Sequence, residues 1–175
     1  MEQYSPALKA KITRNVKRLA AAGEIDPPIL PYLRAINKVP GIVTLWSCWG
    51  HHEKFSMPQI WRGNYDGFFR ASGYIVLLCE PGLHAFLFDF LTRMLKRIFV
   101  IEISEHNCCN SLNGKMCPTI NVHFAGGNDY APMVLGTLGY LLRKGSAIYR
   151  QSLLVAENRD EWLEGRIYEE LVKNF

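Results

Sequence analysis

The sequence lacks several features that would assign it to a large functional class. Its longest apolar run, near Tyr74–Cys79, is far too short to span a bilayer. The first 22 residues carry five Lys and Arg residues and no apolar segment, so we expect no secretory signal there. The motifs G-x-x-x-x-G-K-[ST], G-x-G-x-x-G and H-E-x-x-H are absent. These absences exclude the usual nucleotide-binding and zinc-protease signatures, and they predict no membrane partner.

The sequence also lacks the even number of cysteines that a closed disulfide framework needs. With no secretory signal expected, an odd count favours a reducing compartment. We therefore expect a cytoplasmic protein whose thiols are free or bound to metal. The five cysteines are Cys48, Cys79, Cys108, Cys109 and Cys117.

Length and composition are those of one globular domain. The chain has 175 residues, 49% of them hydrophobic and 21% charged, so it can bury a core without metal or disulfide staples. The charge is unevenly placed: residues 1–40 hold seven basic and three acidic side chains, and residues 157–175 hold three and six. A basic front favours an anionic ligand in the N-terminal half, and a plain solvated surface is the alternative.

Hydrophobic periodicity predicts alternating helices and strands. The order predicts an α/β (α+β) fold, with a mixed β-sheet of about four strands and helices packed on it, in a single domain over residues 1–175. We predict helices over residues 5–22, 26–37, 83–97, 131–143 and 157–174, strands over 42–46, 73–80, 98–104 and 119–124, a polar turn over 107–118, and a long functional loop over 47–72.

Residues 1–22 contain a predicted basic amphipathic helix. Ser5 is a hydroxyl N-cap followed by Pro6 at the first helical position, and Leu8 and Ile12 begin the apolar face. The opposite face is basic, and we expect it to attract phosphates. Its cations are Lys11, Arg14, Lys17 and Arg18.

The stretch 44–52, TLWSCWGHH, is the most informative for chemistry, because a strand is predicted to end there. A thiol can act as a nucleophile, imidazoles can shuttle protons, and Gly50 lets the backbone approach a ligand closely. The bland alternative is that Cys48 and the two tryptophans simply fill the core. The candidate catalytic residues are Ser47, Cys48, His51 and His52.

Two other groups of side chains invite a functional interpretation. Cys48 and His51 have C-x-x-H spacing, and His106 lies close to three cysteines, but paired zinc knuckles are not formed, so we favour no metal. In the long loop, aromatic residues alternate with arginines, which suits base stacking and phosphate pairing. Anchoring of the loop on the core is the alternative. The loop candidates are Trp61, Arg62 and Arg70.

Residues 23–51 resemble the opening of the wybutosine-synthesis methyltransferase family, which acts at the third step in making the hypermodified guanosine of phenylalanine transfer RNA. The family has an Asp and Pro before a helix that ends in Ile-Asn, and then a strand that ends in Ser-Cys-Ser-Gly-Arg. Trp49 and His51 replace the second Ser and the Arg of that pattern. The matching residues are Asp26, Ile36, Asn37, Thr44, Ser47, Cys48 and Gly50.

The resemblance implies S-adenosylmethionine as cofactor and a modified guanosine of tRNA as substrate. It implies that residues 47–51 line the donor pocket, with Asn37, Thr44 and Gly50 on the cofactor side and His51 or His52 as a base. The basic helix, with Trp61 and Arg62, would hold the RNA.

Our leading hypothesis is therefore a divergent relative of this methyltransferase family. Two alternatives stay open: a non-catalytic protein that binds a nucleotide or a similar anion, and a small Cys/His metalloprotein.

Overall fold

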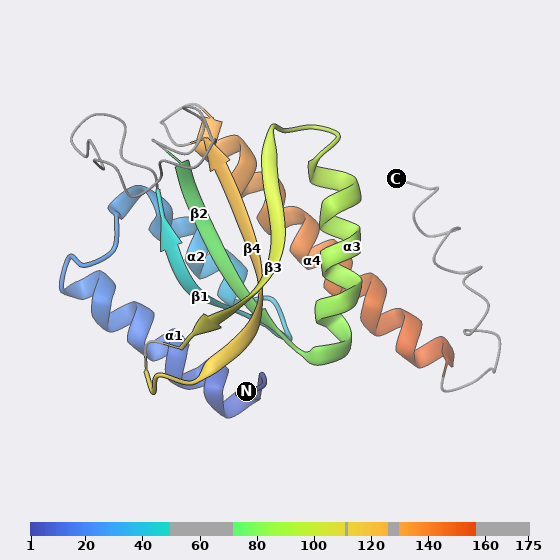
Figure 1. Cartoon of the computed structure of the whole chain (residues 1–175), viewed down its shortest axis with the longest axis horizontal. Coiled ribbons are helices and arrows are strands. Elements are labelled where there is room, and N and C mark those ends of the chain that lie inside the picture. The colour runs from blue at the N-terminus through green and yellow to red at the C-terminus, as the bar shows by residue number, and fades with distance from the viewer. Residues whose placement is uncertain (50–71, 111, 126–129, 157–175) are drawn as a thin grey trace.

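The structure, a computed structural model, describes residues 1–49, 72–110, 112–125 and 130–156, which form a single α+β domain (Figure 1). The elements are α1 (Pro6–Ala21), a short 3-10 helix (Pro27–Ile29), α2 (Leu30–Asn37), β1 (Ile42–Cys48), β2 (Ser72–Cys79), α3 (Pro81–Leu95), β3 (Ile101–Cys109), β4 (Met116–Ala125) and α4 (Tyr130–Ala156).

The four strands form one sheet in the order β1-β2-β4-β3. This confirms the predicted α+β fold, with about four strands and helices packed on the sheet. All three strand pairings are antiparallel, so the sheet is not mixed. The predicted helix over residues 157–174 lies outside the described residues.

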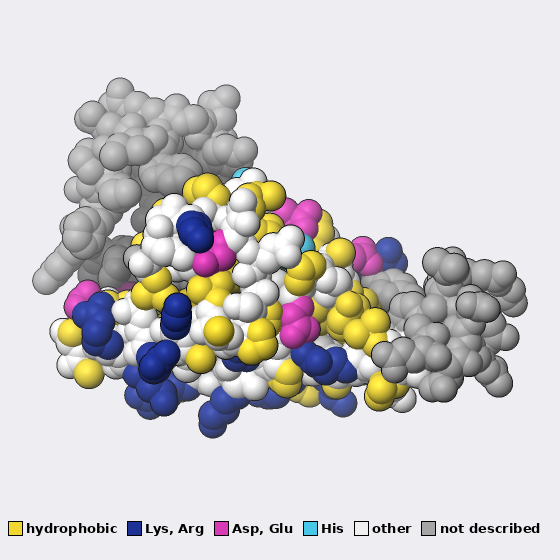
Figure 2. Space-filling view, turned by 90° about the horizontal axis from the view of Figure 1, so that it is seen from below, with side chains coloured by type: hydrophobic (Ala, Val, Ile, Leu, Met, Phe, Trp, Pro, Cys, Tyr) yellow, Lys and Arg dark blue, Asp and Glu magenta, His cyan; other side chains and the backbone are white. Residues whose placement is uncertain are grey.

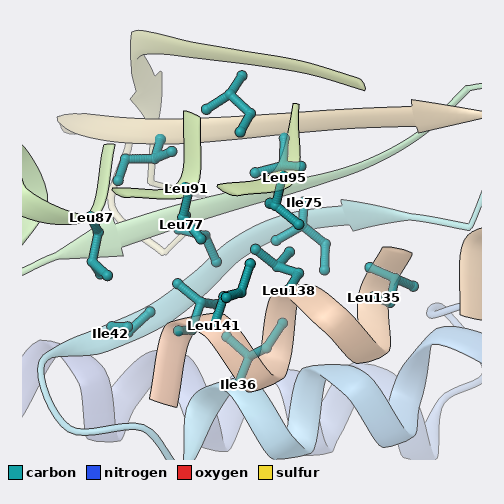
Figure 3. Close-up of a cluster of buried hydrophobic side chains, with 14 of the residues drawn as sticks. Ile36, Ile42, Ile75, Leu77, Leu87, Leu91, Leu95, Leu135, Leu138 and Leu141 are labelled. Atoms are coloured by element: carbon teal, nitrogen blue, oxygen red, sulfur yellow. The ribbon is translucent and has the colours of Figure 1, made fainter. Parts of the chain in front are cut away.

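Helices α2, α3 and α4 cover one face of the sheet and enclose the main core. Figure 3 shows side chains from all three helices meeting Ile42, Ile75 and Leu77 of the sheet. Helix α4 approaches α3 closely at Gly145, where a Cβ atom would lie 2.7 Å from Leu87 Cδ2. None of the helices among the described residues is long and apolar enough to cross a membrane.

Helix α1 packs on the opposite face of the sheet. Ser5 caps it as predicted, since its Oγ accepts a hydrogen bond from the Leu8 backbone N–H at 3.1 Å. Leu8 and Ile12 pack in a second, smaller cluster whose sheet residues include Val43 and Leu78. The sheet is thus covered fully on one face and only partly on the other.

The predicted polar turn over residues 107–118 is wrong, because β3 and β4 pair through most of it. Cys108 lies directly opposite Cys117, and the turn itself is confined to residues 110–115. Asn110 N–H donates to the Lys115 carbonyl at 2.8 Å, and Gly114 supplies the left-handed backbone with φ +70°. Asparagine, glycine and proline suggested a longer turn, but Pro118 sits within the ladder opposite Asn107.

Three other predicted boundaries also move. Ser47 and Cys48 belong to β1 rather than to the loop. The third strand begins at Ile101 instead of residue 98, and α4 continues to Ala156 instead of ending at residue 143. Most of the predicted functional loop, residues 50–71, lies outside the described part of the chain.

Candidate functional site

The part of the sheet that α1 leaves uncovered is the candidate site. Directly opposed residues of an antiparallel sheet project to the same face, and alternate residues along each strand share it. Starting from Val43 and Leu78, which lie beneath α1, this rule identifies the other side chains of that face. We call the following set the open face: Trp46, Cys48, Tyr74, Val76, Glu102, Ser104, His106, Cys108, Asn121 and His123.

A β-bulge brings Trp46 to the open face. The register of β1 against β2 shifts between Thr44, opposite Leu77, and Trp46, opposite Val76. Without the extra residue, Leu45, Thr44 and Trp46 would project to the same side. With it, Thr44 faces the helices and Trp46 faces away from them.

Four aromatic rings lie on the open face, those of Trp46, Tyr74, His106 and His123. Trp46 is 43% exposed, and its Nε1–H donates to the Cys109 carbonyl oxygen at 2.8 Å, so the indole reaches across the sheet from β1 to β3. Tyr74 and His123 are neighbours on the two central strands, with ring centroids 5.8 Å apart. No described helix covers these rings.

The two central rings are uncharged at neutral pH. Burial lowers the pKa of His123, against a smaller opposing effect from Glu102. Burial also raises the pKa of Tyr74, and the nearby Cys48 raises it further. Neutral rings suit stacking against a planar ligand rather than direct pairing with a phosphate.

Polar side chains lie between these rings and the β3–β4 turn. The Asn121 carboxamide oxygen lies 3.2 Å from Thr119 Oγ1 and 3.8 Å from Cys108 Sγ. Ser104 Oγ is buried and has no hydrogen-bond partner among the described residues.

Two of the predicted catalytic residues lie on opposite faces of the sheet. Ser47 pairs with Ile75 of the main core, whereas Cys48 pairs with Tyr74 on the open face, so the two side chains project to opposite faces. Gly50, His51 and His52 lie outside the described residues, as do Trp61, Arg62 and Arg70.

Asn37 and Thr44, the predicted cofactor-binding residues, bind each other. Asn37 Oδ1 accepts hydrogen bonds from the Thr44 backbone N–H at 2.8 Å and from Thr44 Oγ1 at 3.1 Å, and both residues are buried. Nearby, Asp26 Oδ2 accepts from the Trp49 N–H at 3.2 Å, and Trp49 stacks on Tyr32. These polar residues fasten β1 to the segment around α2.

The predicted phosphate-binding side chains of α1 are exposed on the surface. Of the four, Arg18 lies 3.9 Å from Glu24 and also contacts Asn15. Lys9 donates to the Val39 carbonyl on one side of α1. Lys11, on the other side of the helix, helps to lower the pKa of Glu2. The exposed set is Lys11, Arg14, Lys17 and Arg18.

Lys11 therefore lies toward the β3–β4 turn. Hydrogen bonds from Asn113 and Asn110 hold the Glu2 carboxylate there, and they are the main causes of its lowered pKa. Arg18, seven residues after Lys11, projects from the same side of the helix. This side of α1 borders the open face.

The thiols give the metal alternative no support among the described residues. No group of three or more His, Cys, Asp and Glu side chains in this part of the chain could hold a metal ion. Burial raises the pKa of both Cys79 and Cys117, so these thiols stay protonated at neutral pH.

Comparison of the chain with protein-family models, curated proteins and solved structures finds no match.

His84 lies at the other edge of the sheet from β1. Its Nε2 is 2.7 Å from Glu105 Oε1, beside a shallow depression of about 200 Å³. Its Nδ1 is buried without a partner among the described residues. The contact between His84 Nε2 and Glu105 joins α3 to β3, which is a structural role for His84.

The alternation of residues along two strands indicates part of the open face, which was not among the predicted sites. His123 alternates with Val122 and Phe124, which are both fully buried. Alternation puts His123 on the face away from the main core, and the same pattern applies to Tyr74 between Gly73 and Ile75. The position of Trp46 had no such signal, because it depends on the bulge.

Proposed function

We propose that the chain binds RNA, with unstacked bases on the open face and phosphates on the cations of α1. The observation that carries this proposal is the presentation of Trp46, Tyr74 and His123 on a part of the sheet that no helix of the described residues covers. Antiparallel sheets that bind single-stranded RNA place aromatic side chains on such a face, where bases stack on them. Each stacked base contributes about 1–3 kcal/mol by alanine substitution.

Charge and ring chemistry support the same ligand. The rings are neutral, and the cations lie beside them on α1, which separates base contacts from phosphate contacts. Lys11 is the α1 cation that lies toward the β3–β4 turn. A cytoplasmic location, expected from the cysteines, fits an RNA ligand.

The test is a titration of a labelled RNA stem-loop at low salt with wild-type protein and Trp46→Ala. We expect Trp46→Ala to weaken binding about 5- to 150-fold, which corresponds to the loss of about 1–3 kcal/mol from one stacked base. Tyr140→Ala is the matched control, because Tyr140 is an aromatic residue of similar exposure (46%) on α4. Equal affinities of the two variants would contradict the proposal.

Methyl transfer to a guanosine of tRNA is the second candidate function. The observation that favours it is that resemblance residues hold both ends of β1: Asn37 binds Thr44 near its start, and Asp26 binds the Trp49 N–H just after its end, next to Cys48. Incubation with S-adenosylmethionine and tRNA that lacks the late wybutosine steps tests it by mass spectrometry of the nucleosides. A mass gain of one methyl group supports transfer, and binding of RNA without any gain supports the non-catalytic function.

A further inference from the structure

Three of the four α-helices contain no acidic residue within their described bounds. Helices α1, α2 and α4 include Lys and Arg but neither Asp nor Glu. Two of their cations are neutralised from outside the helices: Arg18 lies near Glu24, and Arg150 lies 3.1 Å from Glu80. The remaining exposed cations, with no ion pair to a described acidic side chain, are Lys11, Arg14, Lys17, Arg34 and Arg143, together with Lys38 directly after α2.

The three helices meet at the short connection between α2 and β1. Lys9 of α1 donates to the Val39 carbonyl, and Ser146 Oγ of α4 donates to the Pro40 carbonyl at 3.1 Å. Helix α4 also passes close to α2, where a Cβ atom on Gly139 would lie 4.0 Å from Ile36 Cγ1. The cations of α2 and α4 are therefore close to this connection, which the N-terminal part of α1 also contacts.

Figure 2 shows this neighbourhood from below. Lys and Arg side chains gather over the lower half of the view, and acidic side chains lie mainly above them. Arg143 lies one turn before Ser146, and Lys38 lies two residues before Pro40, so the Ser146–Pro40 hydrogen bond brings their backbones together. We call Arg34, Lys38 and Arg143 the helical-layer cations.

We propose that the helical-layer cations form a second phosphate-binding surface, and that the ligand is a folded RNA that extends around the β1 edge of the domain. This rests on the proposed RNA binding. The α1 cations and the helical-layer cations lie on opposite sides of the sheet. Because a helix with its side chains is about 10–12 Å across, a mononucleotide cannot contact both sets. A continuous polynucleotide backbone can.

Among the described residues, no acidic side chain forms an ion pair with Arg34, Lys38 or Arg143, which favours a polyanion as the ligand of this surface. Isolated exposed charges contribute little, but several like charges without counter-charges create a field that attracts phosphates over about 8 Å at physiological salt. Glu80 is the acidic group closest to the α2–β1 connection that the contacts show, and it is paired with Arg150.

The experiment compares Lys38→Gln/Arg143→Gln with Lys96→Gln/Arg97→Gln. Each variant loses one lysine and one arginine, all four side chains are exposed, and Lys38 and Lys96 are both helix C-caps. Circular dichroism checks the fold of each. Binding of an RNA stem-loop and of guanosine monophosphate is measured across a series of salt concentrations.

We expect the first variant to bind the stem-loop about tenfold more weakly at low salt. Its plot of log affinity against log salt should be shallower by about 1.5, because two phosphate contacts are lost. The control should match wild type, and guanosine monophosphate affinity should be the same for all three proteins. A stem-loop affinity and slope equal to those of the control overturn the inference.

Two further outcomes separate this inference from the proposed function. If Trp46→Ala binds RNA with the same affinity as the wild-type protein, the proposed function itself fails. If wild-type protein binds RNA and Trp46→Ala weakens it, but the Lys38/Arg143 variant does not, only the second surface fails. If the variant loses binding to phosphatidylserine vesicles instead of RNA, the partner is a membrane surface and the inference is overturned.

Discussion

Substitution of Asn37 by alanine tests whether this residue acts in folding or in holding a cofactor. The change removes the acceptor of two hydrogen bonds, from the Thr44 backbone N–H and from the Thr44 hydroxyl. Thr44 is 2% exposed, so water cannot replace the lost partner. A buried N–H left unsatisfied costs about 1–3 kcal/mol, and loss of the hydroxyl bond costs about 1 kcal/mol more. We expect the free energy of unfolding to fall by about 2–4 kcal/mol.

The measurement is urea unfolding followed by circular dichroism. Thr44→Val removes only the hydroxyl and keeps the shape, so it should cost about 1 kcal/mol. Asn15→Ala is the control, because Asn15 makes its hydrogen bond to Arg18 at the surface and should change stability by less than about 0.5 kcal/mol. A loss in Asn37→Ala no greater than that of the control would refute the argument. Reduced affinity for S-adenosylmethionine at unchanged stability would instead assign Asn37 to cofactor binding.

Two other predictions concern the core and the N-terminal segment. Ile36 is fully buried between the sheet and α4, so Ile36→Ala should lower the free energy of unfolding by about 2–5 kcal/mol, and a denaturant-measured loss under about 0.5 kcal/mol would contradict its burial. Hydrogen bonds from Asn113 and Asn110 lower the pKa of Glu2 below its ordinary value of 4.5, so their stabilisation is present above that pH and is lost as the pH falls through the lowered pKa. The free energy of unfolding, measured between pH 7 and pH 3, should depend less on pH in Glu2→Gln than in wild type. Equal pH dependence would show that Asn110 and Asn113 do not bind this carboxylate in solution.

Local sequence signals predicted the elements well where a specific residue starts or stops them. The Ser5–Pro6 pair defined the start of α1, and Leu8 and Ile12 marked the apolar face with which it packs on the sheet. The end of α4 was misjudged at Arg143, because a glycine shortly after it looks like a stop signal. In the structure, Gly145 is needed for close contact with α3. That reason is tertiary and leaves no local trace.

The candidate site was harder to predict for the same reason. Adjacent residues such as Ser47 and Cys48 were grouped by sequence proximity, but a strand sends neighbours to opposite faces. The open face instead combines residues from four strands, and its largest ring depends on a bulge between Thr44 and Trp46. Pairing between distant strands cannot be read from the composition of one segment.

The sheet surface on which α1 packs has a consequence for the order of folding. It is built from Val43 of β1, Leu78 of β2 and Cys117 of β4, which become neighbours only after three strands have paired. We predict that α1 docks after these strands have paired and that its contacts are largely absent from the transition state for folding. In stopped-flow experiments, Leu8→Ala should speed unfolding and leave the folding rate nearly unchanged. In that case the contacts of α1 set the lifetime of the native state, and the pairing of the strands sets the speed of folding.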